Sequence, residues 1–394
     1  MVSQIMAGHG KKRSVIREIF EYSKARSAQI GAENVFDFSL GNPSVPAPAC
    51  VNETIRALTN GDSVLLHGYT SAQGDAAVRE KISDYLNSLH GCGLNKDLIY
   101  MTCGAAASLT ITIKALTCDG DEFITFAPFF PEYRVFTQSA GATLKVSMPR
   151  KPDFQPDIAD FESLISENTK GVIINSPNNP SGVVYSEESI KALCAVLDKK
   201  QREYGHPIYL ITDEPYRELV YGSVKVPFVM NYYNNTIVCY SFSKALSLPG
   251  ERIGYIAVSP NAQESGDVYA AVCGAGRCLG YVCAPSMMQY VIKECIGAVS
   301  DISVYEKNRN LLYDNLTEMG YECVRPDGAF YLFVKALEDD AYAFCEKAKQ
   351  FELLLVPGDD FGTPGYIRIA YCVSTERIEK SLPAFKALAD LYKK

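Results

Sequence analysis

Several side chains of this 394-residue sequence have the types that would hold a phosphate beside an aldehyde. The residues suited to phosphate are a small-residue turn with bare backbone N–H groups, two hydroxyls and one guanidinium: Gly104, Ala105, Ala106, Ser241, Ser243 and Arg252. Lys244 follows the two serines and would form a Schiff base with an aldehyde if its neighbours keep the amine reactive. The sequence therefore offers a phosphate cradle next to a nucleophilic amine.

Four further residues suit an aromatic ring that carries both groups. Burying Asp213 alone would be costly, and a pyridinium nitrogen is a suitable partner for its carboxylate. Asn179 and Tyr216 have side chains that would hydrogen-bond a phenolic oxygen, while Phe130 would stack on the ring face. A phosphate-bearing aromatic aldehyde of this kind is pyridoxal 5'-phosphate, which we expect as the cofactor.

These residues follow short apolar runs that read as strands. The runs occupy residues 98–101, 122–126, 172–174, 208–211, 237–240 and 253–258. Segments of helical periodicity lie between them, including a helix that we expect to begin after Ser186. Strands that are apolar throughout, separated by amphipathic helices, predict an α/β fold with a mostly parallel sheet covered on both faces. Because ligands bind beyond the carboxyl ends of such strands, the polar residues listed above should meet there.

The last third of the chain predicts a smaller α+β unit. Apolar runs lie at residues 330–334, 353–356 and 366–370, with helical patterns at 341–351 and after Ser374. A chain of this length exceeds what one core usually organises, so two domains are expected. We expect a large cofactor-binding domain of residues 48–308 and a discontinuous small domain of residues 1–47 and 309–394.

Composition argues against several classes of partner. The formal charge is −8 and the longest basic run is residues 11–13, so a nucleic-acid role is not expected. No apolar stretch reaches the roughly 18 residues of a membrane-spanning helix. Thirteen scattered cysteines without a Cys-x-x-Cys pair, and only four histidines, predict no metal site and a reducing, cytoplasmic location.

Residues 241–254 match the lysine signature of the class I/II aminotransferases at every defined position. Six further motifs follow the order and approximate spacing of that family, at residues 41–43, 68–69, 128–133, 179–182, 213–216 and 366–369. The sequence therefore resembles these pyridoxal-phosphate-dependent enzymes of fold type I, the aspartate aminotransferase superfamily, over roughly residues 35–375.

The resemblance implies a role for each matching residue. Lys244 would be the Schiff-base lysine and proton shuttle, Asp213 would hold the ring nitrogen protonated, and Tyr216 with Asn179 would contact the ring oxygen. Arg368 would bind the substrate α-carboxylate, with help from the backbone of Gly41 and from Asn179. Tyr69 would reach the phosphate of a partner subunit, which makes a homodimer with shared active sites the expectation.

The resemblance leaves the substrate open. Arg277 lies 33 residues after Lys244. In one subgroup of the family, an arginine near this spacing is donated by the partner subunit and binds the side-chain carboxylate of the substrate. We therefore expect transfer from an L-amino acid, aspartate first, to a 2-oxo acid such as 2-oxoglutarate. The alternatives are an aromatic or alanine aminotransferase and a carbon-sulfur β-lyase. A regulatory binding protein built on the same fold is less favoured, because only about 35 residues precede the first motif.

Overall fold

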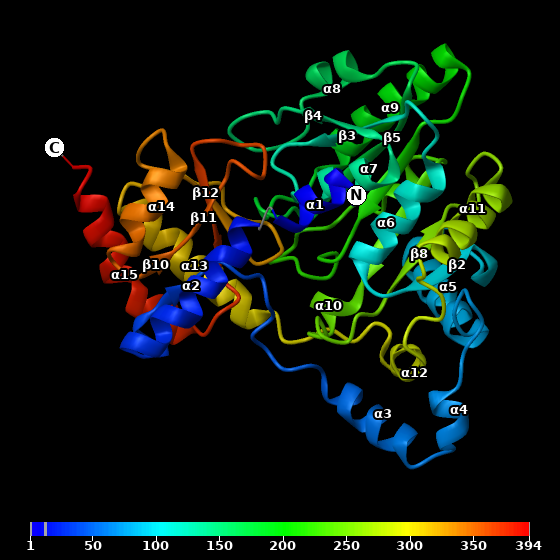
Figure 1. Ribbon diagram of the computed structural model, residues 1–394, viewed down its shortest axis with the longest axis horizontal. Coiled ribbons are helices and arrows are strands. Elements are labelled where there is room, and N and C mark those ends of the chain that lie inside the picture. The colour runs from blue at the N-terminus through cyan, green and yellow to red at the C-terminus, as the bar shows by residue number, and fades with distance from the viewer. Residues whose placement is uncertain (1, 12–13, 394) are drawn as a thin grey trace.

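A computed structural model describes residues 2–11 and 14–393 of the chain (Figure 1). Its largest element is a seven-stranded sheet with the strand order β2-β8-β7-β6-β5-β3-β4. The strands are β2 (Ile99–Thr102), β3 (Glu122–Phe126), β4 (Thr143–Ser147), β5 (Thr169–Asn175), β6 (Tyr209–Asp213), β7 (Thr236–Ser241) and β8 (Gly254–Val258). β8 runs antiparallel to its neighbours β2 and β7, and the other neighbouring pairs are parallel. The predicted α/β fold with a mostly parallel sheet is confirmed.

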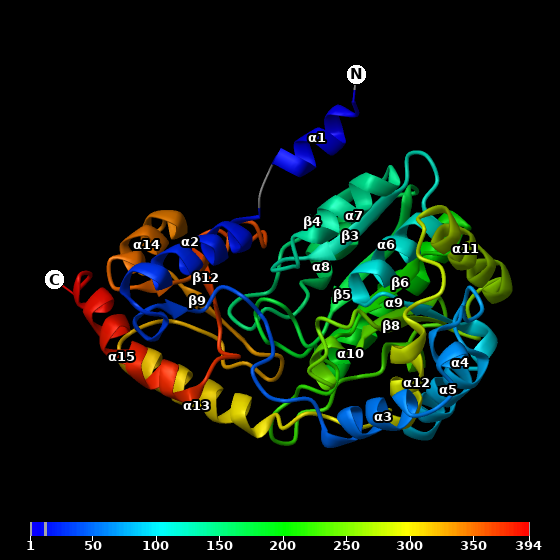
Figure 2. The ribbon, with the colours of Figure 1, turned by 60° about the horizontal axis from the view of Figure 1, so that its bottom comes forward.

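Helices cover both faces of this sheet (Figure 2). The helices of this part of the chain are α3 (Ala49–Thr59), α4 (Ser63–His67), α5 (Ala76–His90), α6 (Ala105–Leu116), α7 (Glu132–Ala140), α8 (Ile158–Leu164), α9 (Glu187–Tyr204), α10 (Phe242–Ala245), α11 (Ser265–Cys278) and α12 (Ser286–Cys295). Of these, α3 and α4 lie at the periphery and pack against α12 (Figure 1). Ile173 of β5 belongs to the apolar core that contains α6, while its neighbours Val172 and Ile174 belong to the core that contains α9. Burial on both faces explains why these strands are apolar throughout.

A second, smaller group of strands is formed by the two ends of the chain. β9 (Tyr331–Lys335), β11 (Val356–Pro357) and β12 (Tyr366–Ala370) form an antiparallel sheet, and β1 (Phe36–Asp37) pairs in parallel with β10 (Leu353–Leu354). The accompanying helices are α2 (Val15–Ile30), α13 (Ser303–Glu318), α14 (Ala341–Lys349) and α15 (Thr375–Asp390). Phe38 shares one buried core with Phe330, Phe344 and Phe385, so the N-terminal segment packs with the C-terminal third. The exact domain boundaries stay a prediction.

The remaining elements are short or peripheral. Single turns of 3-10 helix form η1 (Ala32–Asn34), η2 (Lys96–Leu98) and η3 (Val229–Asn231). Helix α1 (Gln4–Lys11) has no buried residue and projects from the rest of the chain in Figure 2. Lys12 and Arg13, which belong to the basic run noted in the sequence, lie outside the described residues. Within the part of the chain described, no helix combines the length and hydropathy needed to cross a membrane.

Two differences from the sequence-based expectations have simple causes. Residues 353–356 were expected as one strand, but β10 and β11 pair with different partners, β1 and β12. Strand β4 was not expected, because it lies at the edge of the sheet and most of its residues are only partly buried. Half-exposed edge strands do not need the continuous apolar run that marks a central strand.

Candidate active site

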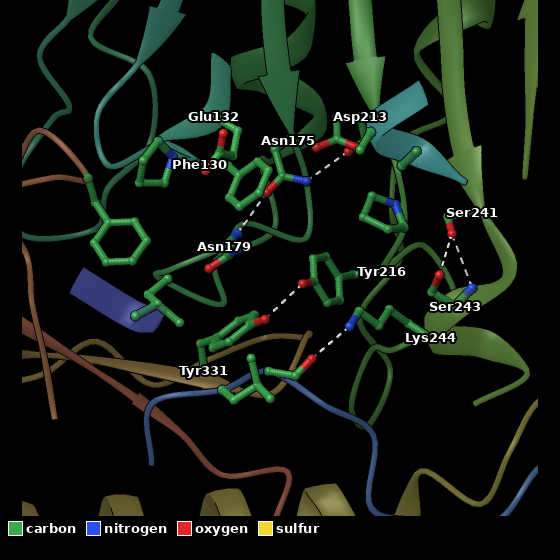
Figure 3. Close-up of a pocket in the computed structure, with 18 of the residues that line it drawn as sticks. Phe130, Glu132, Asn175, Asn179, Asp213, Tyr216, Ser241, Ser243, Lys244 and Tyr331 are labelled. Atoms are coloured by element: carbon green, nitrogen blue, oxygen red, sulfur yellow. Dashed lines mark hydrogen bonds between the residues drawn. The ribbon is translucent and has the colours of Figure 1, made fainter. Parts of the chain in front are cut away.

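A cavity of about 370 Å³ lies where β5, β6 and β7 end, and the residues of the second sheet close its other side. Twelve of the residues expected in the site line this cavity: Gly41, Ala105, Ala106, Phe130, Asn179, Asp213, Tyr216, Ser241, Ser243, Lys244, Arg252 and Arg368. Figure 3 shows several of these side chains around a common space. The volume falls in the usual range of small-molecule sites.

Lys244 projects into the cavity from α10, the short helix that directly follows β7. Its Nζ donates a hydrogen bond of 2.7 Å to the carbonyl oxygen of Gly41. Burial lowers the pKa of Lys244 to about 8, and the positive charges of Arg252 and Arg368 act in the same direction. A much larger fraction of this amine is therefore unprotonated near neutral pH than of an ordinary lysine, as a nucleophile or proton acceptor requires.

Asp213 is the last residue of β6, and only one of its carboxylate oxygens has a partner. Tyr133 donates its hydroxyl to Oδ2 at 2.6 Å, while Oδ1 is buried without a hydrogen bond. Desolvation raises the pKa of this carboxyl to about 7, against the opposing effect of the Tyr133 hydrogen bond. A buried carboxylate with one free oxygen is suited to a positively charged donor, such as a protonated ring nitrogen.

The residues expected to bind a phosphate come from two segments that the sheet brings together. Gly104 caps the N-terminus of α6 with φ of 85°, and a Cβ added there would lie 2.8 Å from Nη2 of Arg252. The hydroxyl groups of Ser241 and Ser243 are hydrogen-bonded to each other at 2.7 Å. The N–H groups of Ala105 and Ala106 belong to the first turn of α6, which lacks intrahelical acceptors. A helix N-terminus, two hydroxyls and a guanidinium that lie together suit an anionic ligand.

Arg368 lies on β12, with only 2% of its surface exposed. Its Nη1 donates to Oδ1 of Asn179 at 3.1 Å, and Nη2 donates to the backbone oxygen of Ser39. Its Nε is buried without a hydrogen bond. Because an arginine remains charged even when burial lowers its pKa, this arrangement favours an anionic ligand such as a carboxylate.

Three residues that the sequence reading did not assign support the site, and Figure 3 shows two of them, Asn175 and Tyr331. Tyr133 supports Asp213 as described, and Asn175 donates its Nδ2 to the backbone oxygen of Asp213 at 2.8 Å. Tyr331 shares a 2.9 Å hydroxyl hydrogen bond with Tyr216. One signal in the sequence pointed to Tyr133, because it lies within the motif at residues 128–133. Nothing in the sequence marked Tyr331.

Two residues expected in the site lie elsewhere in this single chain. Tyr69, between α4 and α5, is 99% exposed, and Arg277 is exposed in the last turn of α11. Neither lines the cavity. Gly104 is not part of the wall itself but precedes the two alanines that are. The roles of Tyr69 and Arg277 stay predictions that require a second copy of the chain.

Comparison with known proteins identifies the family. Residues 33–385 match the family model of aminotransferase class I and II. The aspartate aminotransferase of Thermotoga maritima is 30% identical over 367 residues, which cover 91% of this chain and 93% of that protein. A probable aspartate aminotransferase of Methanocaldococcus jannaschii is 30% identical over 386 residues, covering 96% and 97% of the two chains.

Solved structures agree with the sequence relatives. An aminotransferase from Eubacterium rectale superposes with a TM-score of 0.98 at 58% identity, covering 100% of both chains. The Thermotoga maritima aspartate aminotransferase structure superposes with a TM-score of 0.87 at 29% identity, covering 99% of this chain and 100% of that one. The family resemblance and the fold expected from the sequence are both confirmed. The chain belongs to the class I and II aminotransferases and is a transaminase.

Proposed function

We propose that the protein is a pyridoxal-phosphate-dependent aminotransferase that moves the amino group of an L-amino acid to a 2-oxo acid such as 2-oxoglutarate. The observation that carries this proposal is the pairing, in one cavity, of a lysine with a lowered pKa and a buried carboxylate with a free oxygen. Aspartate is the first donor to test, because several relatives are named aspartate aminotransferases.

The residues of the cavity fit pyridoxal phosphate. The unpaired Oδ1 of Asp213 would accept a hydrogen bond from the protonated ring nitrogen, and Phe130 would cover one face of the ring. Asn179 and Tyr216 would donate to the ring oxygen. The phosphate would be held by the following groups: the backbone of Ala105 and Ala106, and the side chains of Ser241, Ser243 and Arg252.

When bound, pyridoxal phosphate supplies an electron-withdrawing ring that accepts the negative charge developing at the donor's α-carbon. Asp213 keeps that ring positively charged, since its carboxylate would otherwise remain buried without a counter-charge. Lys244 would act as the general base that accepts the proton from the donor's α-carbon, which its lowered pKa favours near neutral pH. Arg368 holds the α-carboxylate and so fixes which bond of the α-carbon faces Lys244.

The proposal includes a homodimer with shared active sites. Tyr69 and Arg277 are exposed here, so they could serve a site only in a second copy of the chain. Val64 and Leu65, near Tyr69 on α4, are 83% and 65% exposed, which supports a protein partner for this face. We also place the enzyme in the reducing cytoplasm, because its thirteen cysteines are all free thiols.

A donor panel with 2-oxoglutarate tests the activity. Purified protein is incubated with aspartate, alanine, tyrosine and cysteine, and the 2-oxo acid, glutamate and ammonia are measured separately. Formation of glutamate with the matching 2-oxo acid is expected, while release of ammonia and pyruvate would identify a carbon-sulfur β-lyase instead. Higher activity with alanine or tyrosine than with aspartate would identify an alanine or aromatic aminotransferase instead.

Lys244→Ala provides the test of the cofactor. Borohydride reduction of the wild type should attach the cofactor covalently to the peptide that contains Lys244, which mass spectrometry detects. The variant should still bind pyridoxal phosphate but lose both this attachment and transamination. A wild-type protein that binds no pyridoxal phosphate would refute the proposal.

A further inference from the structure

We infer that Glu132 and Asp360 form an acidic side-chain subsite that selects amino donors whose side chain ends in a cation. The inference rests on the proposed function, because the subsite is defined relative to a donor held at Arg368. It names a class of substrate that neither the lysine signature nor the named relatives specify.

Two segments that are distant in the sequence bring the carboxylates to one cavity. Glu132 is the first residue of α7, and Asp360 lies in the turn between β11 and β12. The backbone N–H of Phe129 donates to the carbonyl oxygen of Phe361 at 3.0 Å, which fixes the two segments against each other. Both acidic residues line the cavity that also contains Arg368, and Figure 3 shows Glu132 beside Phe130.

Within the part of the chain that the structure describes, these two carboxylates have no paired cation. No hydrogen bond or ion pair joins either side chain to another residue in the described ranges 2–11 and 14–393. Both side chains are half-buried, and Glu132 lies in the first turn of α7. Among the described residues, the cations that line the cavity are Lys244, Arg252 and Arg368, and each already has a proposed ligand.

A second observation shows where the other end of the donor would bind. Arg368 is almost fully buried and keeps Nε without a partner, so the carboxylate end belongs there. Val15, Ile16 and Phe361 give the same cavity an apolar wall that suits an aliphatic stem. An amino acid with a carboxylate, a methylene chain and a terminal ammonium or guanidinium fits this order of groups.

The inference makes a prediction opposite to an aspartate preference. A distal carboxylate, including that of 2-oxoglutarate, would lie near two like charges. Among the described residues, the cations that line the cavity already have proposed ligands, so a cation from a second copy, such as Arg277, would be needed to offset them. A cationic end would instead gain from both acidic residues. Because the subsite is half-exposed to solvent, each carboxylate should raise the affinity for a ligand with a cationic end only a few-fold.

Binding of three length-matched acids to the holoenzyme tests the subsite without catalysis. 6-Aminohexanoate, hexanoate and adipate share one carboxylate and end in an ammonium, a methyl group and a second carboxylate. Calorimetry should rank 6-aminohexanoate first and adipate last. Glu132→Gln and Asp360→Asn should each weaken the binding of 6-aminohexanoate about threefold and leave the affinity for hexanoate unchanged. Glu53→Gln, on the exposed face of α3 away from the cavity, is the matched control and should change nothing.

The same comparison applies to donors. Lysine, norleucine and 2-aminoadipate share three side-chain methylene groups and then end in an aminomethyl cation, a methyl group and a carboxylate, and kcat/KM should fall in that order. The subsite is refuted if adipate and 2-aminoadipate rank first, or if the two carboxamide variants leave the ranking unchanged. The proposed function fails separately, if the three acids bind as expected but no donor is transaminated.

Discussion

At Asp213, burial and ionisation oppose each other in the protein without cofactor. Burial raises the pKa of this carboxyl from 3.8 to about 7, and one oxygen lacks any partner. The proton is therefore bound more tightly in the folded chain than in the unfolded chain. The stability that this group contributes is present in full below the unfolded value and is lost as the pH rises to about 7. Above that pH, the fold carries an uncompensated buried charge.

Asp213→Asn should therefore make the cofactor-free protein more stable at pH 8. A shift of roughly three pKa units corresponds to about 4 kcal/mol, and the gain should shrink as the pH falls toward 4. Urea unfolding of the cofactor-free wild type and variant from pH 4.5 to 8.5 measures the difference. Asp84→Asn, exposed on α5, is the control and should show no such pH dependence. An equal effect of both substitutions would contradict this account of Asp213.

We expect Lys244 to set the pH dependence of cofactor capture. With a pKa of about 8, roughly one amine in ten is unprotonated at pH 7, and this fraction rises about tenfold per pH unit below that value. The rate at which cofactor-free protein captures pyridoxal phosphate should rise with pH and level off above about pH 9. Stopped-flow absorbance provides the measurement. A midpoint near 10.5, the value of an exposed lysine, would show that burial does not activate this amine.

Residues to which we assign a chemical role were easier to find in the sequence than the residues that hydrogen-bond to them. Lys244 and Asp213 stand in short motifs at the ends of apolar runs, and Arg368 lies inside another. Tyr133 and Tyr331 act through hydrogen bonds to residues 80 and 115 positions away in the chain. Such pairs depend on how strands are ordered in the sheets, which no local pattern encodes.

Among the elements, burial on both faces decided which strands were predictable. The run at residues 122–126 coincides with β3, and 366–370 coincides with β12. The N-cap predicted at Ser186 is also confirmed, since its side chain accepts from the backbone N–H of Ser189 at the start of α9. β4 escaped prediction because an edge strand is buried only in part.

The N-terminus of α6 gives an element-scale prediction. Gly104 has a φ of 85°, so Gly104→Ala strains the backbone. The added Cβ would lie 2.8 Å from Nη2 of Arg252 and would displace the guanidinium. We expect a loss of about 1–3 kcal/mol in stability and about tenfold weaker binding of pyridoxal phosphate. Denaturant unfolding and fluorescence titration measure the two effects.

Gly91→Ala separates backbone strain from damage to the phosphate site. Gly91 ends α5 with φ of 61°, and a Cβ there would meet nothing within 4 Å. This variant should lose stability by about 1 kcal/mol but bind the cofactor normally. Equal cofactor affinity in the two alanine variants would mean that Gly104 does not shape the phosphate cradle.

At the scale of the whole molecule, the cavity joins segments from both ends of the chain and from the central sheet. Gly41 precedes α3, Lys244 follows β7 and Arg368 lies on β12, so the site forms only when the two groups of strands are packed together. The resemblance to the family predicted this arrangement, whereas the role of a second copy depends on Tyr69 and Arg277. Both residues face solvent in one chain, and mixed dimers can test them directly.

Mixing Lys244→Ala subunits with Arg277→Ala subunits should restore activity toward dicarboxylate donors if Arg277 acts across a dimer interface. Neither variant alone has a complete site, but a mixed dimer combines the intact Lys244 of one chain with the intact Arg277 of the other. Random pairing makes half of the dimers mixed, each with one complete site, so about one quarter of wild-type activity should appear. The measurement is aspartate transamination after the two variants are refolded together, compared with each variant refolded alone. Activity no higher than the average of the two separate variants would mean that Arg277 does not complete the site of a second chain.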